Sequence, residues 1–548
     1  REDLRRQPAD CAGVICLGGA AEPLSMSLKR AQARYGMRYE VDDKEKVQVS
    51  LGKIPHGGRR FYDNRMEFPV RFSGDLKLIT EVSAALYPNR RNHPDQAEES
   101  PVAVAVLKRN PGPEERFRLE SVPYGMHTLR ISCVINGKRH VVAEELVSMI
   151  HREVKRDEHN WFGLISHADR FDRNIPLELD NVAAAGGSWT RMEFILAELY
   201  RDGKLDFSHH RRLFEEGKRR GIRFFGLLNT TPPGCSLMPG DGYWAQPNLD
   251  RWREMCAAVM TEFKGKIDHW EIWNEPDVVK KMWNSSIEEY CRLYETAAKR
   301  IKARFPGVKI GGPVLARVRP GSNDENARIF LGYCRDHQVP LDFFSWHSYS
   351  GPRQPFAILD EARRARELLD RYGFHETELH LTEWRYLEKW DRIYNIMGKH
   401  PAGGIKVASH LIHCLIAWQK SPLAMTCFYL IGHGSSSWSP WFYGKKQKLY
   451  YAFRAFAEMA HYENLVRCAS DSEAIRLIAG RDAQGKRAIL LAVFLPEGES
   501  CGEIAVRLPS GMESVKWKVL LLDEAHDLEE IACGTGDNVL ILPDSGGE

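Results

Sequence analysis

Eight short apolar runs separated by amphipathic helical segments fill the middle of the chain, and this alternation limits the fold more than any other feature. The runs are residues 162–166, 188–192, 222–228, 269–273, 308–312, 343–347, 378–382 and 426–431. Strands that alternate with helices pair in parallel, and eight such units can close on themselves. We therefore predict a (β/α)8 TIM barrel over residues 156–460.

One predicted helix, over residues 286–304, shows how clear the helical signal is. Ser286 is followed three positions later by Glu289, which is the pattern of a capping box. Apolar side chains then recur on one face at Ile287, Tyr290, Tyr294, Ala297 and Ile301. A stripe of this kind is typical of a helix that packs against a sheet.

The pattern changes to alternating apolar and polar residues on both sides of the predicted barrel. Before it, the alternating segments are residues 65–72, 75–82, 102–107, 128–135 and 138–142, and after it they are 474–479, 487–494, 503–508, 514–522 and 538–542. Asn136-Gly137 separates two of these segments, which predicts a hairpin turn. We expect an all-β domain over residues 1–155 and a β-sandwich domain over residues 461–548, so the fold class is α/β with a barrel between two sandwich-like β domains.

Composition argues against several classes of partner and cofactor. The 77 lysines and arginines nearly balance 74 acidic residues, which gives no electrostatic reason to expect binding to nucleic acid. The sequence contains no apolar run of about 18 residues, so no membrane span is predicted. Twelve cysteines occur without a Cys-x-x-Cys pair, and no His-Glu-x-x-His motif is present, so we expect neither a cofactor nor a metal. A homo-oligomer is left open.

Residues 11–21 give the only hint of location. The segment is apolar and follows Arg5 and Arg6, but its three glycines favour a strand or loop over a signal peptide. Because the chain opens on Arg1, a removed start remains an alternative, and a secreted or periplasmic location is slightly favoured over the cytoplasm.

Two glutamates stand where predicted strands end. Residues 269–277 read HWEIWNEPD, an apolar strand that stops at Asn274, Glu275 and Pro276, and residues 378–384 read ELHLTEW, which ends its apolar alternation at Glu383. Either site alone could be a surface strand end. In a barrel, however, the carboxyl ends of all parallel strands meet at one mouth, so the two carboxylates are expected to face each other.

A facing pair of carboxylates is what hydrolysis of a glycosidic bond requires. One carboxylic acid protonates the departing oxygen, while the other carboxylate attacks the anomeric carbon or activates water. A separation of about 5 to 5.5 Å makes the second group a nucleophile and retains configuration, whereas about 6.5 to 9.5 Å admits a water and inverts it. The sequence leaves this distance open.

The ordered motifs WTRMEF, FFGLLNTTPP, HWEIWNEPD, WHSYS and LTEW resemble those of retaining glycoside hydrolases of clan A, and most of all family 39, which includes β-xylosidases and α-L-iduronidases. The resemblance covers roughly residues 160–460. It implies a glycosidase that cleaves O-glycosidic bonds in oligo- or polysaccharides by double displacement, with Glu275 as acid/base and Glu383 as nucleophile. The expected partner is thus a carbohydrate substrate.

Further side chains near strand ends are candidates for substrate binding, namely Asn274, His347, Tyr349, Arg191, His167, Asn229 and Trp384. The Asn274 amide can bind a sugar hydroxyl, and Tyr349 and Arg191 are placed to keep Glu383 ionised. The structural alternatives are a core histidine for His347 and, for Arg191, an ion pair with Glu193 or another acid. Trp244, Trp283, Trp438 and Trp441 also fall in predicted loops, where flat rings could stack on sugars.

One departure from the family pattern follows the eighth strand, where Phe428 and Tyr429 occupy positions at which clan members often have a tryptophan. Two competing functions remain. A non-catalytic carbohydrate-binding protein on a barrel scaffold would not need two acids at strand ends. A metal-dependent hydrolase is less favoured because the histidine motifs that hold zinc are missing.

Overall fold

The computed structural model describes residues 47–51, 60–61, 65–88, 100–123, 125–149, 162–170, 174–201, 203–232, 234–237, 242–319, 322–431, 436–442, 445–497, 499, 502–508, 515–536 and 539–542. Residues 11–21, with their signal-like composition, lie outside this set, as does the boundary predicted near residue 155. Within the described part, no helix is long and apolar enough to cross a membrane.

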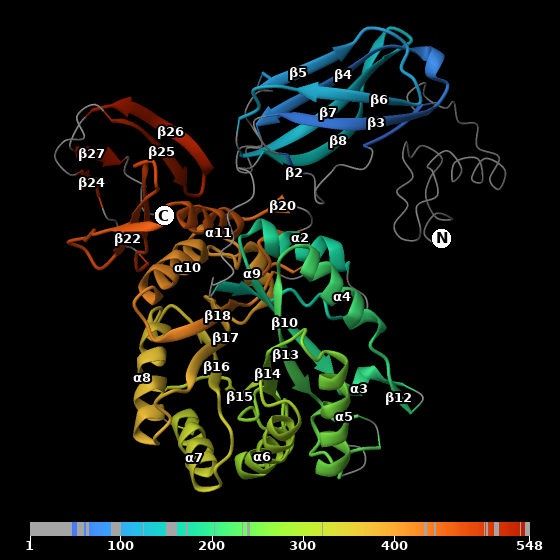
Figure 1. Ribbon diagram of the computed structural model, residues 1–548. Coiled ribbons are helices and arrows are strands. Elements are labelled where there is room, and N and C mark those ends of the chain that lie inside the picture. The colour runs from blue at the N-terminus through green and yellow to red at the C-terminus, as the bar shows by residue number, and fades with distance from the viewer. Residues whose placement is uncertain are drawn as a thin grey trace, which may run out of the picture.

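A closed barrel of eight parallel strands forms the centre of the molecule, as predicted (Figure 1). Its strands in order are β9 (Phe162–Leu164), β10 (Trp189–Ile195), β13 (Arg223–Asn229), β14 (His269–Ile272), β15 (Lys309–Leu315), β16 (Phe343–Ser350), β17 (Glu378–Tyr386) and β18 (Leu423–Phe428). Strand β17 runs four residues beyond its predicted end, because residues 383–386 continue to pair with residues 347–350 of β16.

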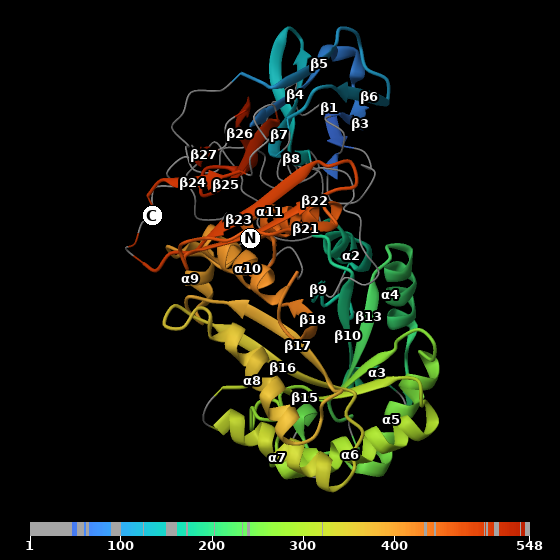
Figure 2. The same cartoon turned by 60° about the vertical axis from the view of Figure 1, so that its left-hand side comes forward.

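Helices cover the outside of the barrel (Figures 1 and 2). They are α2 (Ile175–Ala184), α4 (Ser208–Arg219), α5 (Leu249–Glu262), α6 (Ile287–Arg304), α7 (Ser322–Asp336), α8 (Ala357–Arg371), α10 (Ile405–Trp418) and α11 (Lys448–Glu458), with two short helices, α3 (Leu196–Leu199) and α9 (Arg392–Met397), in the loops. Helix α6 starts as predicted, since the Ser286 side chain accepts a hydrogen bond from the Glu289 backbone N–H at 3.3 Å. Its predicted apolar stripe is buried.

Two antiparallel sheets precede the barrel. One contains β1 (Val47–Leu51), β3 (Met66–Gly74) and β6 (Glu114–Leu119), and the other β2 (Arg60–Phe61), β8 (Lys138–Met149), β7 (Gly125–Ile135), β4 (Ile79–Pro88) and β5 (Ala103–Leu107), with β2 parallel to β8. The hairpin at Asn136-Gly137 forms, with φ of 48° and 80° at these residues. The predicted strand 75–82 is partly wrong, because Leu76–Leu78 forms a 3-10 helix before β4 begins.

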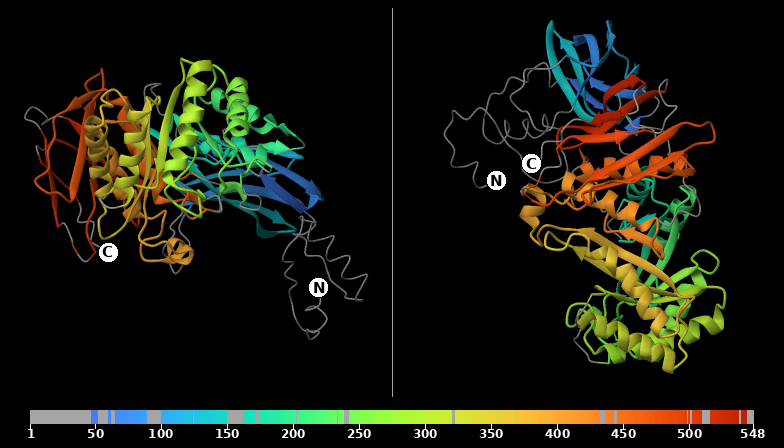
Figure 3. Two further views of the ribbon diagram at one scale, coloured as in Figure 1. Left: turned by 90° about the horizontal axis from the view of Figure 1, so that it is seen from below. Right: turned by 90° about the vertical axis from the view of Figure 1, so that its left-hand side faces the viewer.

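Short antiparallel sheets follow the barrel, built from β21 (Asn464–Val466), β22 (Ile475–Arg481) and β23 (Arg487–Val493), from β24 (Ile504–Arg507) and β27 (Val539–Leu542), and from β25 (Lys516–Leu522) and β26 (Asp527–Thr535). Strand β26 was not predicted. Both β regions lie at the same side of the barrel, where β22 contacts α10, and β26 contacts both α11 and β7 (Figures 1 and 3). Lys448 of α11 forms a buried ion pair with Asp527 at 2.8 Å.

Candidate active site

The backbone after β14 is held in an unusual conformation that places Glu275 at the barrel mouth. Trp273 and Glu275 have positive φ of 68° and 45°, which is uncommon for residues with side chains. The Trp273 N–H donates to the Leu228 carbonyl at 2.8 Å, and the Glu275 N–H donates to the Val314 carbonyl at 3.0 Å. These bonds tie the turn to the loop ends of both neighbouring strands, and strain of this kind is typical of functional sites.

Glu383 lies in β17 and is surrounded by groups that donate hydrogen bonds or carry positive charge. It accepts a hydrogen bond from the Tyr349 hydroxyl at 2.8 Å and another from the Arg191 guanidinium. Burial alone raises the pKa of Glu383, but His347, Arg191 and Tyr349 together lower it below its ordinary value. These partners therefore favour the ionised form of Glu383.

His347 lies between the two glutamates. Its Nδ1 is 2.8 Å from Glu275 Oε1 and 3.6 Å from Glu383 Oε2. Arg191 Nη1 approaches the other ring nitrogen, Nε2, at 3.4 Å. Because a guanidinium only donates, Nε2 accepts, and in the neutral ring Nδ1 carries the proton and donates to Glu275. His347 is fully buried, as a core histidine would be. It nevertheless contacts both glutamates, so it is part of the candidate site.

Glu275, His347 and Glu383 form one compact group at the mouth. One carboxylate oxygen from each glutamate and one His347 nitrogen all lie within 4.8 Å of one another. The Glu275 side chain is 15% exposed and that of Glu383 is 9% exposed, so Glu275 is the more accessible carboxylate. Sequence analysis predicted that the two acids would meet, and the barrel brings them together.

Arg191 connects these carboxylates to two further residues. Its guanidinium is 3.4 Å from Asn274 Oδ1 and 3.7 Å from Glu271 Oε2. Glu271 is fully buried, and neither of its oxygens has a hydrogen-bond partner among the residues that the structure describes. Among the described residues Arg191 forms no ion pair with Glu193, which Arg170 binds at 2.7 Å. The other structural alternative, a pair with another acid, is what Arg191 has with Glu271.

His167 and Asn229 lie on the β9 to β13 side of the mouth. His167 Nε2 is 3.0 Å from the Tyr429 hydroxyl, and its side chain is 20% exposed. Asn229 is fully buried and donates to Glu193 at 2.6 Å. His167 is therefore accessible to a ligand, whereas Asn229 positions another side chain.

The structure contradicts the substrate-binding role predicted for Trp384. Side chains alternate along a strand, so Trp384 points away from the side on which Glu383 lies. Its ring is fully buried and packs edge-on against Trp418 at 4.6 Å and Phe428 at 5.1 Å between ring centroids. Trp283 and Trp441, two of the loop tryptophans, are buried as well.

An aromatic group that sequence analysis only partly identified borders Glu383. The Tyr349 ring lies 5.2 Å from Trp390, 6.2 Å from Tyr429 and 6.4 Å from Trp438, measured between ring centroids. Trp390 was missed, although it is 73% exposed. Its position just before the short helix α9 gives no periodic signal, and only the tryptophan-rich stretch WRYLEKW pointed to it.

Arg385 holds the loops that carry part of this aromatic group. Its buried guanidinium donates to the carbonyls of Tyr429 at 3.0 Å, Trp438 at 2.6 Å and Ala402. Burial lowers the pKa of Arg385 to about 9. The loops after β17 and after β18 are thus joined through a single side chain.

Comparison with known proteins agrees with this geometry. The family model described as glycosyl hydrolases family 39 matches residues 249–387. A β-xylosidase of Geobacillus stearothermophilus is 27% identical over 184 residues, which are 29% of this chain and 33% of that protein. A β-xylosidase of Caldicellulosiruptor saccharolyticus is 34% identical over 99 residues, 18% of this chain and 19% of the relative. The match thus spans about a third of the length of the first of these relatives.

Solved structures share the fold. A family 39 glycoside hydrolase from Bacteroides cellulosilyticus WH2 superposes with a TM-score of 0.63 at 14% identity, covering 91% of this chain and 98% of that one. A family 39 β-xylosidase from Caulobacter crescentus gives a TM-score of 0.54 at 18% identity over 72% of this chain and 95% of that one. The resemblance predicted from the motifs is confirmed: the barrel segment 249–387, which carries Glu275 and Glu383, matches the model of glycosyl hydrolases family 39.

Proposed function

We propose that the protein is a retaining glycoside hydrolase in which Glu275 is the acid/base and Glu383 the nucleophile. The observation that carries the proposal is the approach of their carboxylate oxygens to within 4.8 Å. Retaining enzymes hold the two carboxyl groups about 5 to 5.5 Å apart, whereas inverting enzymes need about 6.5 to 9.5 Å to admit a water. This approach of the nearest oxygens fits the closer, retaining arrangement, in which Glu383 attacks the sugar directly.

The surroundings of each glutamate support the division of roles. Glu383 contacts the Arg191 guanidinium and the Tyr349 hydroxyl, both of which favour a carboxylate ready to attack. Oε1 of Glu275 accepts a hydrogen bond from His347, so the other carboxyl oxygen can carry the proton for the leaving group. Two carboxyl groups in different environments are the usual arrangement for acid and nucleophile in one site.

The reaction then proceeds in two steps. Glu383 attacks the anomeric carbon while Glu275 gives its proton to the departing oxygen, so the glycosidic bond breaks as the ester bond to Glu383 forms. Glu275, now a carboxylate, removes a proton from water as that water attacks the anomeric carbon and releases Glu383. The sugar leaves with its original configuration, and both glutamates return to their starting states.

β-Xylosides are the first substrates to test, because two relatives are described as β-xylosidases. The measurement is hydrolysis of a panel of aryl glycosides of both anomers by wild type, Glu383→Gln and Glu275→Gln. Glu254→Gln is the control, since that side chain is 54% exposed on α5 and lies outside the site. We expect loss of turnover by orders of magnitude in the first two variants and none in the control.

Product stereochemistry tests the mechanism separately from the substrate. The anomer released first, followed by NMR during hydrolysis, should have the configuration of the substrate. An inverted product would overturn the role of Glu383 as nucleophile. If the aryl glycosides and a set of polysaccharides are all left intact, a carbohydrate-binding protein replaces the enzyme as the better interpretation.

A further inference from the structure

A second group of histidine and carboxylate side chains lies at the opposite end of the barrel from the candidate active site. His269 is the first residue of β14, and Glu378 and His380 are at the start of β17. Glu378 precedes Glu383 by five positions on the same strand, which is about 16 Å of extended chain. The group is therefore spatially separate from the proposed chemistry.

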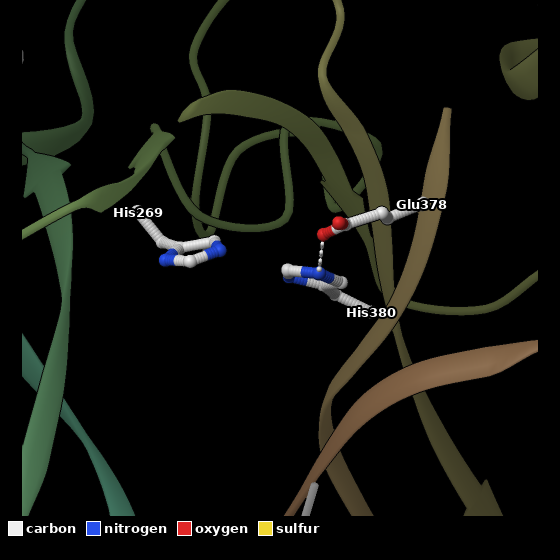
Figure 4. A group of neighbouring side chains, drawn as sticks. All are labelled: His269, Glu378 and His380. Atoms are coloured by element: carbon white, nitrogen blue, oxygen red, sulfur yellow. Dashed lines mark hydrogen bonds and ion pairs between the residues drawn. The ribbon is translucent and has the colours of Figure 1, made fainter. Parts of the chain in front are cut away.

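The three side chains converge on one another (Figure 4). One nitrogen from each imidazole and one oxygen of Glu378 lie within 4.8 Å of one another. His380 Nε2 is 3.0 Å from Glu378 Oε2, and Figure 4 shows the His269 ring facing His380 across a gap. Two strands that are not neighbours in the barrel thus present a pair of imidazoles to each other.

Buried nitrogens without partners indicate that this group is incomplete. His380 is 2% exposed, and within the described part of the chain its Nδ1 has no hydrogen-bond partner. Because the Glu378 carboxylate only accepts, the Nε2 of a neutral His380 carries the proton and Nδ1 keeps a lone pair. The Nδ1 of His269 is likewise buried and has no partner among the described side chains and backbone groups. Buried polar atoms normally have partners, so these two nitrogens are available to a ligand.

The ring geometry fits a shared metal ion. The centroids of the His269 and His380 rings are 5.7 Å apart. Two imidazoles that bind one zinc ion place their centroids about 5 to 6.5 Å apart, because a zinc–nitrogen bond is about 2.0 to 2.1 Å long. Phe343 stacks on the His380 ring at 4.2 Å between centroids, which fixes its orientation.

We propose that His269 and His380 bind a divalent transition metal ion of the zinc type at the floor of the barrel, with Glu378 holding the Nε2–H of His380. A carboxylate that orients a ligating histidine is a common second partner of metal sites. The Glu378 and Lys309 side chains are 32% and 42% exposed, so an ion can enter from solvent. The site would tie β14 to β17.

Lys309 supplies a sharp test of the location. Its ammonium binds Glu378 Oε1, so it lies beside the proposed ion and repels it. Lys309→Met removes this charge and should tighten binding, whereas a site elsewhere on the protein would be indifferent to it. Glu378→Gln should weaken binding by roughly 10- to 100-fold, the usual effect of losing the group that orients a ligand.

The experiment is calorimetric titration of metal-stripped protein with zinc chloride. Saturable binding near one equivalent is expected in wild type and should disappear in His269→Ala, with His380→Gln as a second variant. His337→Ala is the control, because that exposed histidine also lies beside a carboxylate, at 4.0 Å from Glu295. Glu383→Gln reports any ion held by the active-site glutamates instead.

Circular dichroism shows whether each variant is folded. The proposal is overturned if wild type shows no saturable binding, if binding survives in folded His269→Ala and His380→Gln, or if Lys309→Met binds zinc no more tightly than wild type. Glycosidase activity plays no part in these outcomes, so the proposal stands or falls independently of the proposed function.

Discussion

Tyr349→Phe provides a direct test of how the protein keeps its proposed nucleophile ionised. The substitution removes only the hydroxyl that donates to Glu383 at 2.8 Å and leaves Arg191 and His347 in place. A hydrogen bond to a charged group contributes about 1.5 to 3 kcal/mol, and one pKa unit corresponds to about 1.4 kcal/mol. The pKa of Glu383 should therefore rise by roughly 1 to 2 units if no water replaces the hydroxyl.

The assay is the pH dependence of kcat/KM on an aryl glycoside. Glu383 must be ionised to attack, so activity is present above its pKa and is lost as the pH falls through it. Because Tyr349 helps to lower that pKa, its removal should move the acidic limb to higher pH by roughly 1 unit or more. The alkaline limb should move less.

Tyr429→Phe is the matched control. Its hydroxyl lies beside the same aromatic group but contacts His167 at 3.0 Å, with no hydrogen bond to Glu383 recorded among the described residues. An acidic limb that stays in place in Tyr349→Phe, or that moves equally in both variants, would refute the reasoning.

Three further perturbations test other parts of the molecule. Trp390→Ala should raise KM for aryl glycosides more than it lowers kcat, while changing the free energy of unfolding by less than about 0.5 kcal/mol, since the ring is 73% exposed; an unchanged KM would remove Trp390 from the substrate path. Lys448→Met should lower the free energy of unfolding by about 3 to 5 kcal/mol in urea melts, because it leaves buried Asp527 without its ion pair; a pair of substitutions that also changes Asp527→Leu should recover part of the loss. Burial raises the pKa of Asp169, but His167, Arg170 and the Glu193 N–H outweigh it and lower the pKa to about 2. Its contribution to stability is thus complete above the ordinary carboxyl pKa near 4 and fades as the pH falls toward 2. The free energy of unfolding of Asp169→Asn should therefore fall less steeply than that of wild type between pH 4 and pH 2. Equal slopes of the two proteins over this range would contradict the prediction.

The barrel could be predicted from sequence because its strands are apolar on both faces and its helices on one. The end of β17 could not be predicted from residue type. Glu383 and the residues after it are polar or bulky, yet their backbone continues to pair with β16. Trp384 could have been assigned correctly from period two alone, because its neighbour Glu383 was already placed inward. The error arose because Trp384 was assigned to a loop and the alternation of side chains along the strand was not applied to it.

The candidate site was predicted in the placement of its two acids and in the contacts of Glu383 with Tyr349 and Arg191, but not in the bridging contacts of His347. Glu275 and Glu383 follow from two strand ends, whereas the bridging place of His347 depends on side-chain directions across three strands. Burial of Glu271 beside Arg191 was also invisible, because a glutamate within an apolar strand reads as a surface residue. The pair His269 and His380 was missed because residues distant in sequence meet only in the closed barrel.

The buried guanidinium of Arg385 has a consequence for how this protein could be altered. It bonds to backbone carbonyls of both loops, and it also lies 5.3 Å from the centroid of the Trp438 ring. The exposed side chain of Trp390 can therefore be exchanged while the loop frame is kept, whereas a change at Trp438 removes a contact of Arg385. A change in loop length, in contrast, would displace a carbonyl from Arg385 and disturb both loops together. Engineering of substrate preference should therefore replace residues within these loops and leave the loop lengths unchanged.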